Sequence, residues 1–295
     1  MNVEEILAEY AEMTEAALLK YLPPTDCLQK SVADAARYSL QAGGKRIRPA
    51  LVMEFCRVCG GEPETALPVA CAIEMMHTFS LIHDDLPCMD DDDLRRGKPS
   101  CHKAYGEATA VLAGDLLSIM PFEIIAKAGL TKRLPMDCAL QIIKLLAELS
   151  GLYGMIGGQT VDLENEGKQP PVEAILEMYR MKTGALLEFC CKAGCIAAGA
   201  GASLQLSAGA YGQRLGLAFQ IIDDILDITA DEKTLGKPVG SDSKSEKYTY
   251  VSAVGIDSAR GQAKRLTDGA LSALSDFEDT EFLTELTKML LYRQY

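Results

Sequence analysis

The chain has 295 residues, a formal net charge of −13, ten cysteines and no tryptophan, and 48% of its residues are hydrophobic. So acidic a composition excludes a general nucleic-acid-binding protein, because counterion release requires a basic surface. Few aromatic residues beside abundant Ala, Leu, Ile and Met favour helix over strand, so we expect an all-α fold in a single domain covering residues 1–295.

The N-terminal segment is acidic and amphipathic, which predicts neither a secretory signal nor a transit peptide. We find no uncharged apolar run of membrane-spanning length, so we expect no membrane span and a cytoplasmic location. The cysteines are scattered through apolar stretches, which predicts reduced core residues rather than a disulfide framework. Cys56 and Cys59 form a CxxC, but no second pair follows at zinc spacing and we assign them no function.

Hydrophobic periodicity and the positions of Pro and Gly predict about ten helices. The first starts at the N-terminus and ends before Pro23, and the next three cover about 26–41, 49–60 and 63–83. Further helices are expected at about 107–128, 135–150, 172–199, 203–229, 247–274 and 280–292. No repeat, low-complexity tract or long polar linker interrupts them, which favours one domain.

An acidic cluster follows the apolar helix that ends near residue 83, with six carboxylates between Asp84 and Asp93. Charge runs are usually solvated loops, but a plain surface loop does not require so apolar a helix before it. Pro87 and the residues inserted before Asp90 must distort the helix, so we expect Asp84 and Asp90 to converge.

A second acidic cluster, Asp223-Asp224-Ile-Leu-Asp227, lies inside an otherwise apolar helix. Asp223 and Asp227 are four residues apart and share one face, which Gln220 and Gln213 continue. Buried carboxylates are costly unless they are paired or bind metal, so the alternatives are a salt-bridge network and a metal site. Two such clusters facing each other would suit a magnesium diphosphate.

Basic residues recur beside these clusters. The junction from Gly43 to Pro49, at a helix N-terminus, favours anions. Arginine's planar fork suits phosphate, although a pair of arginines after the first cluster could simply neutralise it. A histidine aligned two turns before Asp84 could donate to a diphosphate oxygen. The basic and adjacent polar candidates are Lys45, Arg48, His77, Ser80, Arg95, Arg96, Lys182, Thr183, Lys237 and Lys247.

Several motifs in this order resemble the trans-isoprenyl diphosphate synthase family, and within it the bacterial-type farnesyl or short-chain synthases. The resemblance runs from about 41 to 250. It rests on Gly43–Pro49, Ser80–Gly97, Gly157-Gly158-Gln159 with Asp162, Lys182-Thr183-Gly184, Phe219–Asp227, Leu235-Gly236-Lys237, and Lys247 before Thr249-Tyr250. It implies an isoprenoid synthase fold with about ten core helices around a central cavity, in a homodimer.

The resemblance also implies residue roles. Asp84, Asp90, Asp223 and Asp227 would bind about three Mg²⁺ ions, with Mn²⁺ as a possible substitute. Arg95, Lys182 and Lys237 would contact the allylic diphosphate, dimethylallyl or geranyl, while Lys45, Arg48, His77 and Arg96 would hold isopentenyl diphosphate. Lys247 would also bind substrate. Thr183 and Gln220 would present oxygens to an allylic cation, and with Lys182 they are the catalytic candidates.

Product length in this family is set just before the first acidic motif. Phe79 followed by the small Ser80 resembles farnesyl diphosphate synthases. A smaller group than Phe79 would imply a geranylgeranyl product, and a bulkier residue than Ser80 would imply geranyl. The alternatives are therefore a geranyl or geranylgeranyl diphosphate synthase and a non-catalytic partner subunit, although such subunits usually lack one acidic motif and this chain keeps both.

Overall fold

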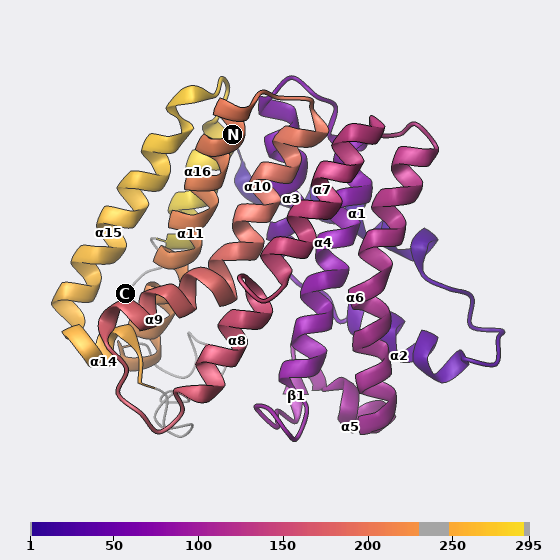
Figure 1. Ribbon diagram of the computed structural model, residues 1–295, viewed down its shortest axis with the longest axis horizontal. Helices are drawn as coiled ribbons and strands as arrows, with labels where there is room; N and C mark the ends of the chain where they lie inside the picture. The colour runs from indigo at the N-terminus through magenta and orange to yellow at the C-terminus, as the bar shows by residue number, and fades with distance from the viewer. Residues whose placement is uncertain (1, 230–247, 292–295) are drawn as a thin grey trace. The chain divides into compact units, whose positions relative to one another are not determined.

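The computed structural model describes residues 2–229 and 248–291. Its longer elements are helical (Figure 1). In chain order they are α1 (Val3–Tyr21), α2 (Lys30–Leu40), α3 (Ile47–Val58), α4 (Pro63–Asp84), β1 (Leu94–Arg95), β2 (Lys98–Pro99), α5 (Cys101–Tyr105), α6 (Glu107–Leu130), α7 (Met136–Ser150), α8 (Met155–Glu164), α9 (Val172–Tyr179), a π turn (Arg180–Gly184), α10 (Ala185–Ala197), α11 (Ala202–Thr229), α14 (Tyr250–Val254), α15 (Ile256–Ala273), a 3₁₀ turn (Leu274–Asp276) and α16 (Glu281–Leu291).

The helices form two compact units. We call Asn2–Ile143 with Ala197–Gly199 the N-terminal unit, and the described residues of Lys144–Ile196 and of the segment from Ala200 onward the C-terminal unit. The boundary falls within α7.

In the N-terminal unit, α4 and α6 pack side by side (Figure 1). Met75 and Ile82 of α4 and Ala113 and Leu117 of α6 belong to one buried cluster, and each is at most 2% exposed. Burial of these apolar side chains is the main force that holds the two helices together. α4 ends at Asp84, so this packing also fixes the start of the first acidic cluster.

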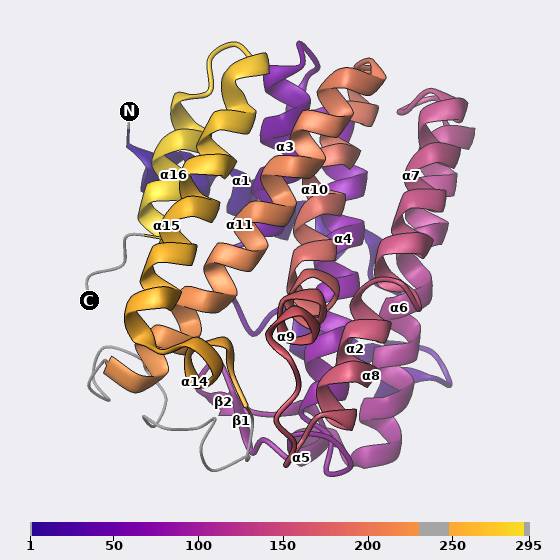
Figure 2. The same cartoon turned by 60° about the vertical axis from the view of Figure 1, so that its left-hand side comes forward.

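In the C-terminal unit, α11 packs against α15 and α16 (Figure 2). Tyr211 of α11 is fully buried and its hydroxyl lies 2.8 Å from Thr287 Oγ1 of α16. Two glycines let α11 approach its other neighbours. A Cβ on Gly212 would lie 2.6 Å from the Leu187 carbonyl oxygen, and one on Gly216 would lie 2.6 Å from Gly184 Cα. Only glycine tolerates such close backbone packing.

The all-α class is confirmed, and most predicted helices lie within a few residues of their expected positions. Strands in the described ranges are confined to the two-residue pair β1 and β2. Three predicted boundaries are wrong. The helix expected from 26 starts at Lys30, the one expected over 172–199 contains a π turn, and the one expected over 247–274 breaks at Gly255, whose φ is +79°. Helix α8 was not predicted.

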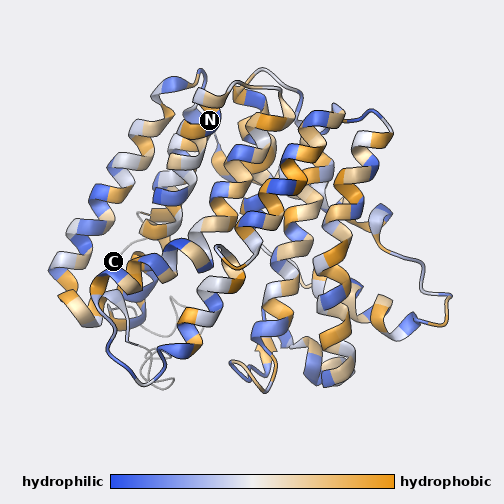
Figure 3. Cartoon of the chain, in the orientation of Figure 1, coloured by the Kyte–Doolittle hydropathy of each residue, from blue (hydrophilic) through white to orange (hydrophobic). Residues whose placement is uncertain are grey.

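Three helices are long and apolar enough to cross a membrane by length and composition alone, namely Pro63–Asp84, Glu107–Leu130 and Met136–Glu164. Each of them contains charged residues, so they do not contradict our expectation that no uncharged apolar run reaches that length, and the lack of a membrane span stays a prediction. Apolar residues occur along α4 (Figure 3) and its buried residues fall on several sides of the helix. Of its most apolar window, 67% is buried inside the protein. All ten cysteines are free, and seven of them are buried, as expected for reduced core residues.

Candidate active site

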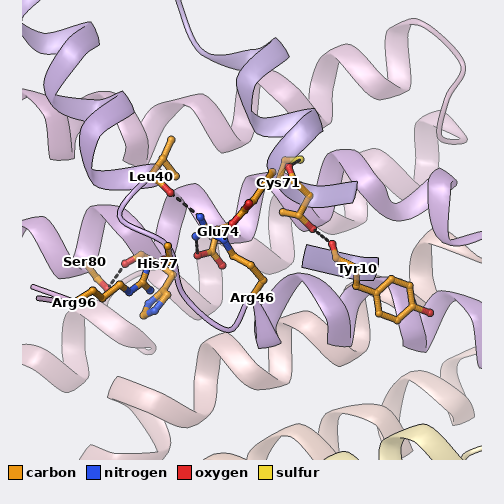
Figure 4. Close-up of polar contacts among 11 residues, drawn as sticks. Tyr10, Leu40, Arg46, Cys71, Glu74, His77, Ser80 and Arg96 are labelled. Carbon is orange, nitrogen blue, oxygen red and sulfur yellow. Dashed lines mark hydrogen bonds and ion pairs between the residues drawn. The ribbon is translucent and has the colours of Figure 1, made fainter. Parts of the chain in front are cut away.

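The loop before α3 is anchored by Arg46, which has a left-handed backbone with φ of 47°. Its guanidinium is almost fully buried, pairs with Glu74 at 2.5 Å and donates to the Leu40 carbonyl at 2.7 Å (Figure 4). A buried arginine must be paired in this way, because an unpaired buried charge is costly. The anchor holds the loop while its neighbour Lys45 stays exposed.

Arg96 reaches the same loop from far along the chain, and its guanidinium donates to the Gly43 carbonyl. Gly44 makes this approach possible, since a Cβ there would lie 2.7 Å from Arg96 Cζ and its φ is +135°. The backbone conformation requires glycine at position 44, and a side chain there would push the Arg96 guanidinium aside. The predicted candidates Lys45 and Arg96 are therefore brought to one loop.

His77 lies among basic side chains. Burial, followed by the charges of Arg48, Arg96, Arg95 and Arg46, holds the pKa of its imidazole well below 6.5. The ring is thus neutral at physiological pH and can donate one hydrogen bond. The structure brings His77 together with Arg48 and Arg96 as predicted, and so concentrated a positive field favours a multiply charged anion.

The first acidic cluster turns back on itself after α4. The Asp90 amide donates to the Asp84 carbonyl at 2.9 Å, and the Asp91 amide donates to the Leu86 carbonyl at 3.2 Å. Asp91 itself has a φ of 49°, a conformation that Asp tolerates better than most residues. The backbones of Asp84 and Asp90 consequently meet, in agreement with the predicted distortion at Pro87.

Other carboxylates of this cluster pair with cations from the following segment. Arg95 pairs with Asp85 and, at 3.2 Å, with Asp92, while Lys103 lies 2.7 Å from Asp93. Burial raises the pKa of Asp85, although the bond from Arg95 opposes this effect. Neutralisation by Arg95, one of the alternatives drawn from the sequence, does occur at Asp85 and Asp92. Contact of Arg95 with a diphosphate stays a prediction.

Phe79 and Ser80 lie one turn before Asp84 on α4. The Phe79 ring packs edge-on against His83, with centroids 4.9 Å apart, and joins the apolar cluster of the unit. The Ser80 hydroxyl donates to the His77 carbonyl at 2.9 Å. Gly114 of α6 leaves room for His83, because a Cβ there would lie 2.2 Å from its Nε2. The ring of Phe79 is therefore held against packed neighbours.

In the C-terminal unit, Lys182 and Thr183 lie in the π turn, a form often found at functional sites. Lys182 Nζ lies 2.7 Å from Asp162 Oδ2 of α8. Helix α8 approaches closely because of Gly158, where a Cβ would lie 2.3 Å from the Lys182 amide nitrogen. Asp162 therefore orients Lys182.

Thr183 and Gln220 are in direct contact, since the Thr183 hydroxyl donates to Gln220 Oε1 at 3.2 Å. Lys182, Gln220 and Asp224 line a cavity of about 140 Å³, together with Asp162 and Tyr179 among others. The predicted catalytic candidates thus lie together in this unit.

The second acidic motif divides between two helix faces. Asp227 is 4% exposed and Asp223 is half-buried, while the buried Asp224 accepts hydrogen bonds from Tyr179 at 2.7 Å and from Gln220 at 3.4 Å. The expectation that Gln213 extends the stripe of Asp223 toward a site is not supported, because its amide donates to Glu188 of α10 at 2.8 Å. Lys237 and Lys247 lie outside the described residues.

Sequence reasoning gave no role to three residues that position the candidates, namely Arg46, Asp162 and Tyr179. Asp162 was noted only as part of a motif. A buried arginine and a tyrosine bound to a distant aspartate leave no local pattern, because their partners are far along the chain.

The carboxylates of the two acidic motifs are donors of the kind that a hard divalent cation prefers. Within residues 2–229 and 248–291, no three His, Cys, Asp or Glu side chains converge as a protein-only metal site. Magnesium needs no such cage, since it takes one or two carboxylates and fills its other positions with water and substrate phosphate. The paired backbones of Asp84 and Asp90 and the shared face of Asp223 and Asp227 supply such donors. That the two motifs face each other stays a prediction.

Comparisons with known proteins agree with this arrangement. The sequence profile of the polyprenyl synthetase family matches residues 29–290. The farnesyl diphosphate synthase of Geobacillus stearothermophilus is 45% identical over 260 residues, covering 88% of this chain and 87% of the relative. That of Escherichia coli (strain K12) is 39% identical over 298 residues and 99% of both chains. The geranylgeranyl diphosphate synthase of Cyanophora paradoxa is 45% identical over 282 residues, or 94% and 92%.

Solved structures give the same result. An FPP/GFPP synthase from Zymomonas mobilis superposes with a TM-score of 0.88 at 36% identity, covering 98% of this chain and 99% of the other. The geranylgeranyl pyrophosphate synthetase of Pyrococcus horikoshii gives 0.90 at 33% identity over 99% of both chains. With its motifs in order and most of its length matched, the chain belongs to the polyprenyl synthetase family.

Proposed function

We propose that this prenyltransferase condenses isopentenyl diphosphate head to tail with dimethylallyl or geranyl diphosphate to give farnesyl diphosphate and diphosphate. The observation that carries the proposal lies in the N-terminal unit. Consecutive arginines join an anion-binding cluster to the acidic loop, because Arg96 donates to the Gly43 carbonyl and Arg95 pairs with Asp85. A diphosphate site therefore adjoins a carboxylate pair suited to magnesium.

Residue roles follow from these surroundings. We assign the isopentenyl diphosphate to Lys45, Arg48, His77 and Arg96, where a neutral imidazole donates among guanidinium groups. We assign the allylic diphosphate to Arg95 and Lys182, and to Lys237 by the family resemblance alone. Lys247 is assigned to substrate binding by the same resemblance. Asp84, Asp90, Asp223 and Asp227 would hold Mg²⁺, in about three ions per site with Mn²⁺ as a substitute.

The chemistry requires no covalent enzyme intermediate. The allylic C–O bond breaks, the diphosphate leaves with the electron pair, and the isopentenyl double bond attacks the allylic cation. A proton then passes to the released diphosphate. Bound Mg²⁺ would supply charge neutralisation at the leaving diphosphate. Arg95 and Lys182 add positive charge there, while the oxygens of Thr183 and Gln220 stabilise the cation electrostatically.

The first experiment incubates purified protein with magnesium, isopentenyl diphosphate and dimethylallyl diphosphate, then separates the dephosphorylated products by chain length. We expect mostly fifteen-carbon product. A ten- or twenty-carbon product would keep the enzyme class and establish the geranyl or geranylgeranyl alternative. No condensation by folded protein would contradict the proposal and favour the non-catalytic partner subunit. Chelation by EDTA should abolish turnover, and added Mg²⁺ should restore it.

A further inference from the structure

Thr183 and Gln220 belong to a longer chain of hydrogen bonds in the C-terminal unit. The Tyr179 hydroxyl donates to Asp224 Oδ2 at 2.7 Å and accepts the Tyr250 amide at 3.2 Å. On the other side of the carboxylate, Gln220 Nε2 donates to Asp224 Oδ1 at 3.4 Å. Tyr179 is 5% exposed and Asp224 is 3% exposed. This series of hydrogen bonds therefore starts at the buried Tyr250 amide, passes through the buried side chains of Tyr179 and Asp224, and ends at Gln220 and Thr183, whose oxygens are predicted to face the allylic cation.

The order of donors along this chain fixes the orientation of the Gln220 amide. A carboxylate only accepts hydrogen bonds, so Gln220 turns its NH₂ toward Asp224. Its carbonyl oxygen then faces the Thr183 hydroxyl, which donates to it at 3.2 Å. Because Thr183 commits its proton to Gln220, its own oxygen remains an acceptor. Both groups thereby present oxygen, and not hydrogen, to whatever else approaches them.

The bond between Gln220 and Asp224 is long, and a contact of 3.4 Å holds a carboxylate weakly. The 2.7 Å bond from Tyr179 is short and lies in a buried environment, where charge-assisted hydrogen bonds are strong. Tyr179 is itself held by the Tyr250 amide. The tyrosine therefore fixes the position of the carboxylate that orients Gln220.

We propose that Tyr179 is a positioning residue for the condensation, acting through Asp224 to keep the carbonyl oxygen of Gln220 available to the allylic cation. This inference rests on the proposed function. When the allylic C–O bond breaks, positive charge develops on the isoprenoid carbon, and a preorganised carbonyl dipole stabilises it. A flipped amide would present N–H hydrogens instead and would raise the energy of the same cation.

The test replaces Tyr179 by Phe, which removes only the hydroxyl. We expect kcat to fall about tenfold to a hundredfold, as for misplacement of groups that act on the transition state. The KM values of both diphosphates should stay close to wild type, because Gln220 acts on charge that appears only during ionisation. In a Gln220→Ala background, Tyr179→Phe should cause no further loss of kcat, since the group that it positions is already gone.

Tyr211→Phe is the matched control. Tyr211 lies on α11, the helix that carries Gln220, is fully buried, and loses a comparable bond, 2.8 Å from Thr287 Oγ1. It should lower thermal stability without changing kcat. Equal losses of kcat in Tyr179→Phe and Tyr211→Phe would show that Tyr179 has only a structural role and would overturn the inference. Additive losses of kcat when Tyr179→Phe is combined with Gln220→Ala would overturn it as well.

A second readout needs neither metal nor turnover. In protein labelled with ¹⁵N at glutamine, the side-chain amide signal of Gln220 is assigned by its absence in Gln220→Ala. We expect slow hydrogen exchange of this amide in the wild type, faster exchange in Tyr179→Phe and no change in Tyr211→Phe. Unchanged exchange in Tyr179→Phe would overturn the inference even in an active enzyme. Inactivity of the wild type would instead count against the proposed function.

Discussion

At the scale of single residues, burial and then local charge decide the protonation of His77. Arg46 is committed to Glu74 and Leu40, so it stabilises the loop. It still contributes, with Arg48, Arg95 and Arg96, to the field that keeps His77 neutral. A neutral imidazole among guanidinium groups offers a hydrogen bond to an anion without adding another repulsive charge to those groups.

The depressed pKa of His77 predicts a pH dependence of stability. Below pH 6.5, the unfolded chain binds a proton that the folded protein resists, so stability should fall as the pH drops from 6.5 toward the folded pKa. Above that window His77 is neutral in both states and has no effect. His77→Gln should flatten this acid limb by up to about 1.4 kcal/mol per pH unit. Urea unfolding of both proteins at several pH values between 7.5 and 5 measures it, and parallel curves would contradict the prediction.

Phe79 and Ser80 predict how product length can be changed. Phe79→Ala removes a ring that packs on His83 and should shift the product from fifteen toward twenty carbons. Ser80→Phe should shift it toward ten by adding bulk beside that ring. Product analysis after dephosphorylation checks both variants. As the control, Phe277→Leu changes a buried ring in the C-terminal unit and should leave chain length unaltered; a shift there would show that chain length responds to any change in packing.

At the scale of helices, close backbone packing sets the position of the π turn. Gly216 of α11 meets Gly184, and Gly158 of α8 meets the Lys182 amide, so glycines from two helices pack on the turn. Backbone atoms cannot move aside as a flexible side chain can, so an added methyl group must displace the turn.

Gly216→Ala should therefore destabilise the protein by about 1–3 kcal/mol and lower kcat by moving Thr183 away from Gln220. Gly261→Ala on α15 is the matched control, since its Cβ would meet only Arg265 Nη1, at 3.7 Å. The control should be neutral or gain about 0.5–1 kcal/mol through helix propensity. Denaturant unfolding and steady-state kinetics distinguish the two, and equal behaviour would contradict this account of the close contact.

The sequence predicted the long helices well because apolar periodicity and Gly or Pro breaks are local signals. The sequence did not predict elements whose conformation depends on tertiary packing. Helix α8 contains Gly157 and Gly158, which read as a break but serve close packing. The same holds for the site. The backbone contact between Asp84 and Asp90 was expected from the distortion at Pro87, whereas the pairings of Tyr179 with Asp224 and of Arg46 with Glu74 join residues 45 and 28 positions apart.

At the scale of the whole molecule, the homodimer implied by the family resemblance stays a prediction, and exposed apolar residues on α6 and α7 are its candidate interface. Leu112, Ile119 and Leu140 are 53%, 65% and 59% exposed, and all belong to the N-terminal unit. An apolar face of this kind often marks a protein interface. A cytoplasmic location stays a prediction, with which the ten free cysteines are compatible.

Introducing a charged residue into this apolar face tests the interface. Ile119→Glu should convert a dimer into a monomer, because burying an unpaired carboxylate in an apolar contact is costly. Leu206→Glu is the control, since Leu206 of α11 is 70% exposed and lies on another unit. Light scattering after size exclusion measures the mass of each. A monomeric wild type, or a dimeric Ile119→Glu variant, would contradict the assignment to this face.

The single domain also stays a prediction. The chain forms two compact units by its internal contacts, and the family match from 29 to 290 spans both. One cooperative transition, coincident by two spectroscopic probes, would support a single folding domain.

The π turn between α9 and α10 adds one residue to what would otherwise be a continuous α-helix. A π turn closes i to i+5 where an α turn closes i to i+4, so it behaves as a one-residue insertion into a continuous helix. Residues on its two sides are therefore out of register with each other by roughly 100°, the rotation of one helical residue. Deleting Met181 would restore a regular helix from Val172 to Ala197. The resulting regular helix would have normal α-helical hydrogen bonds throughout, but Tyr179 would be rotated relative to α10. The additional residue in the π turn therefore keeps Tyr179 oriented toward the site.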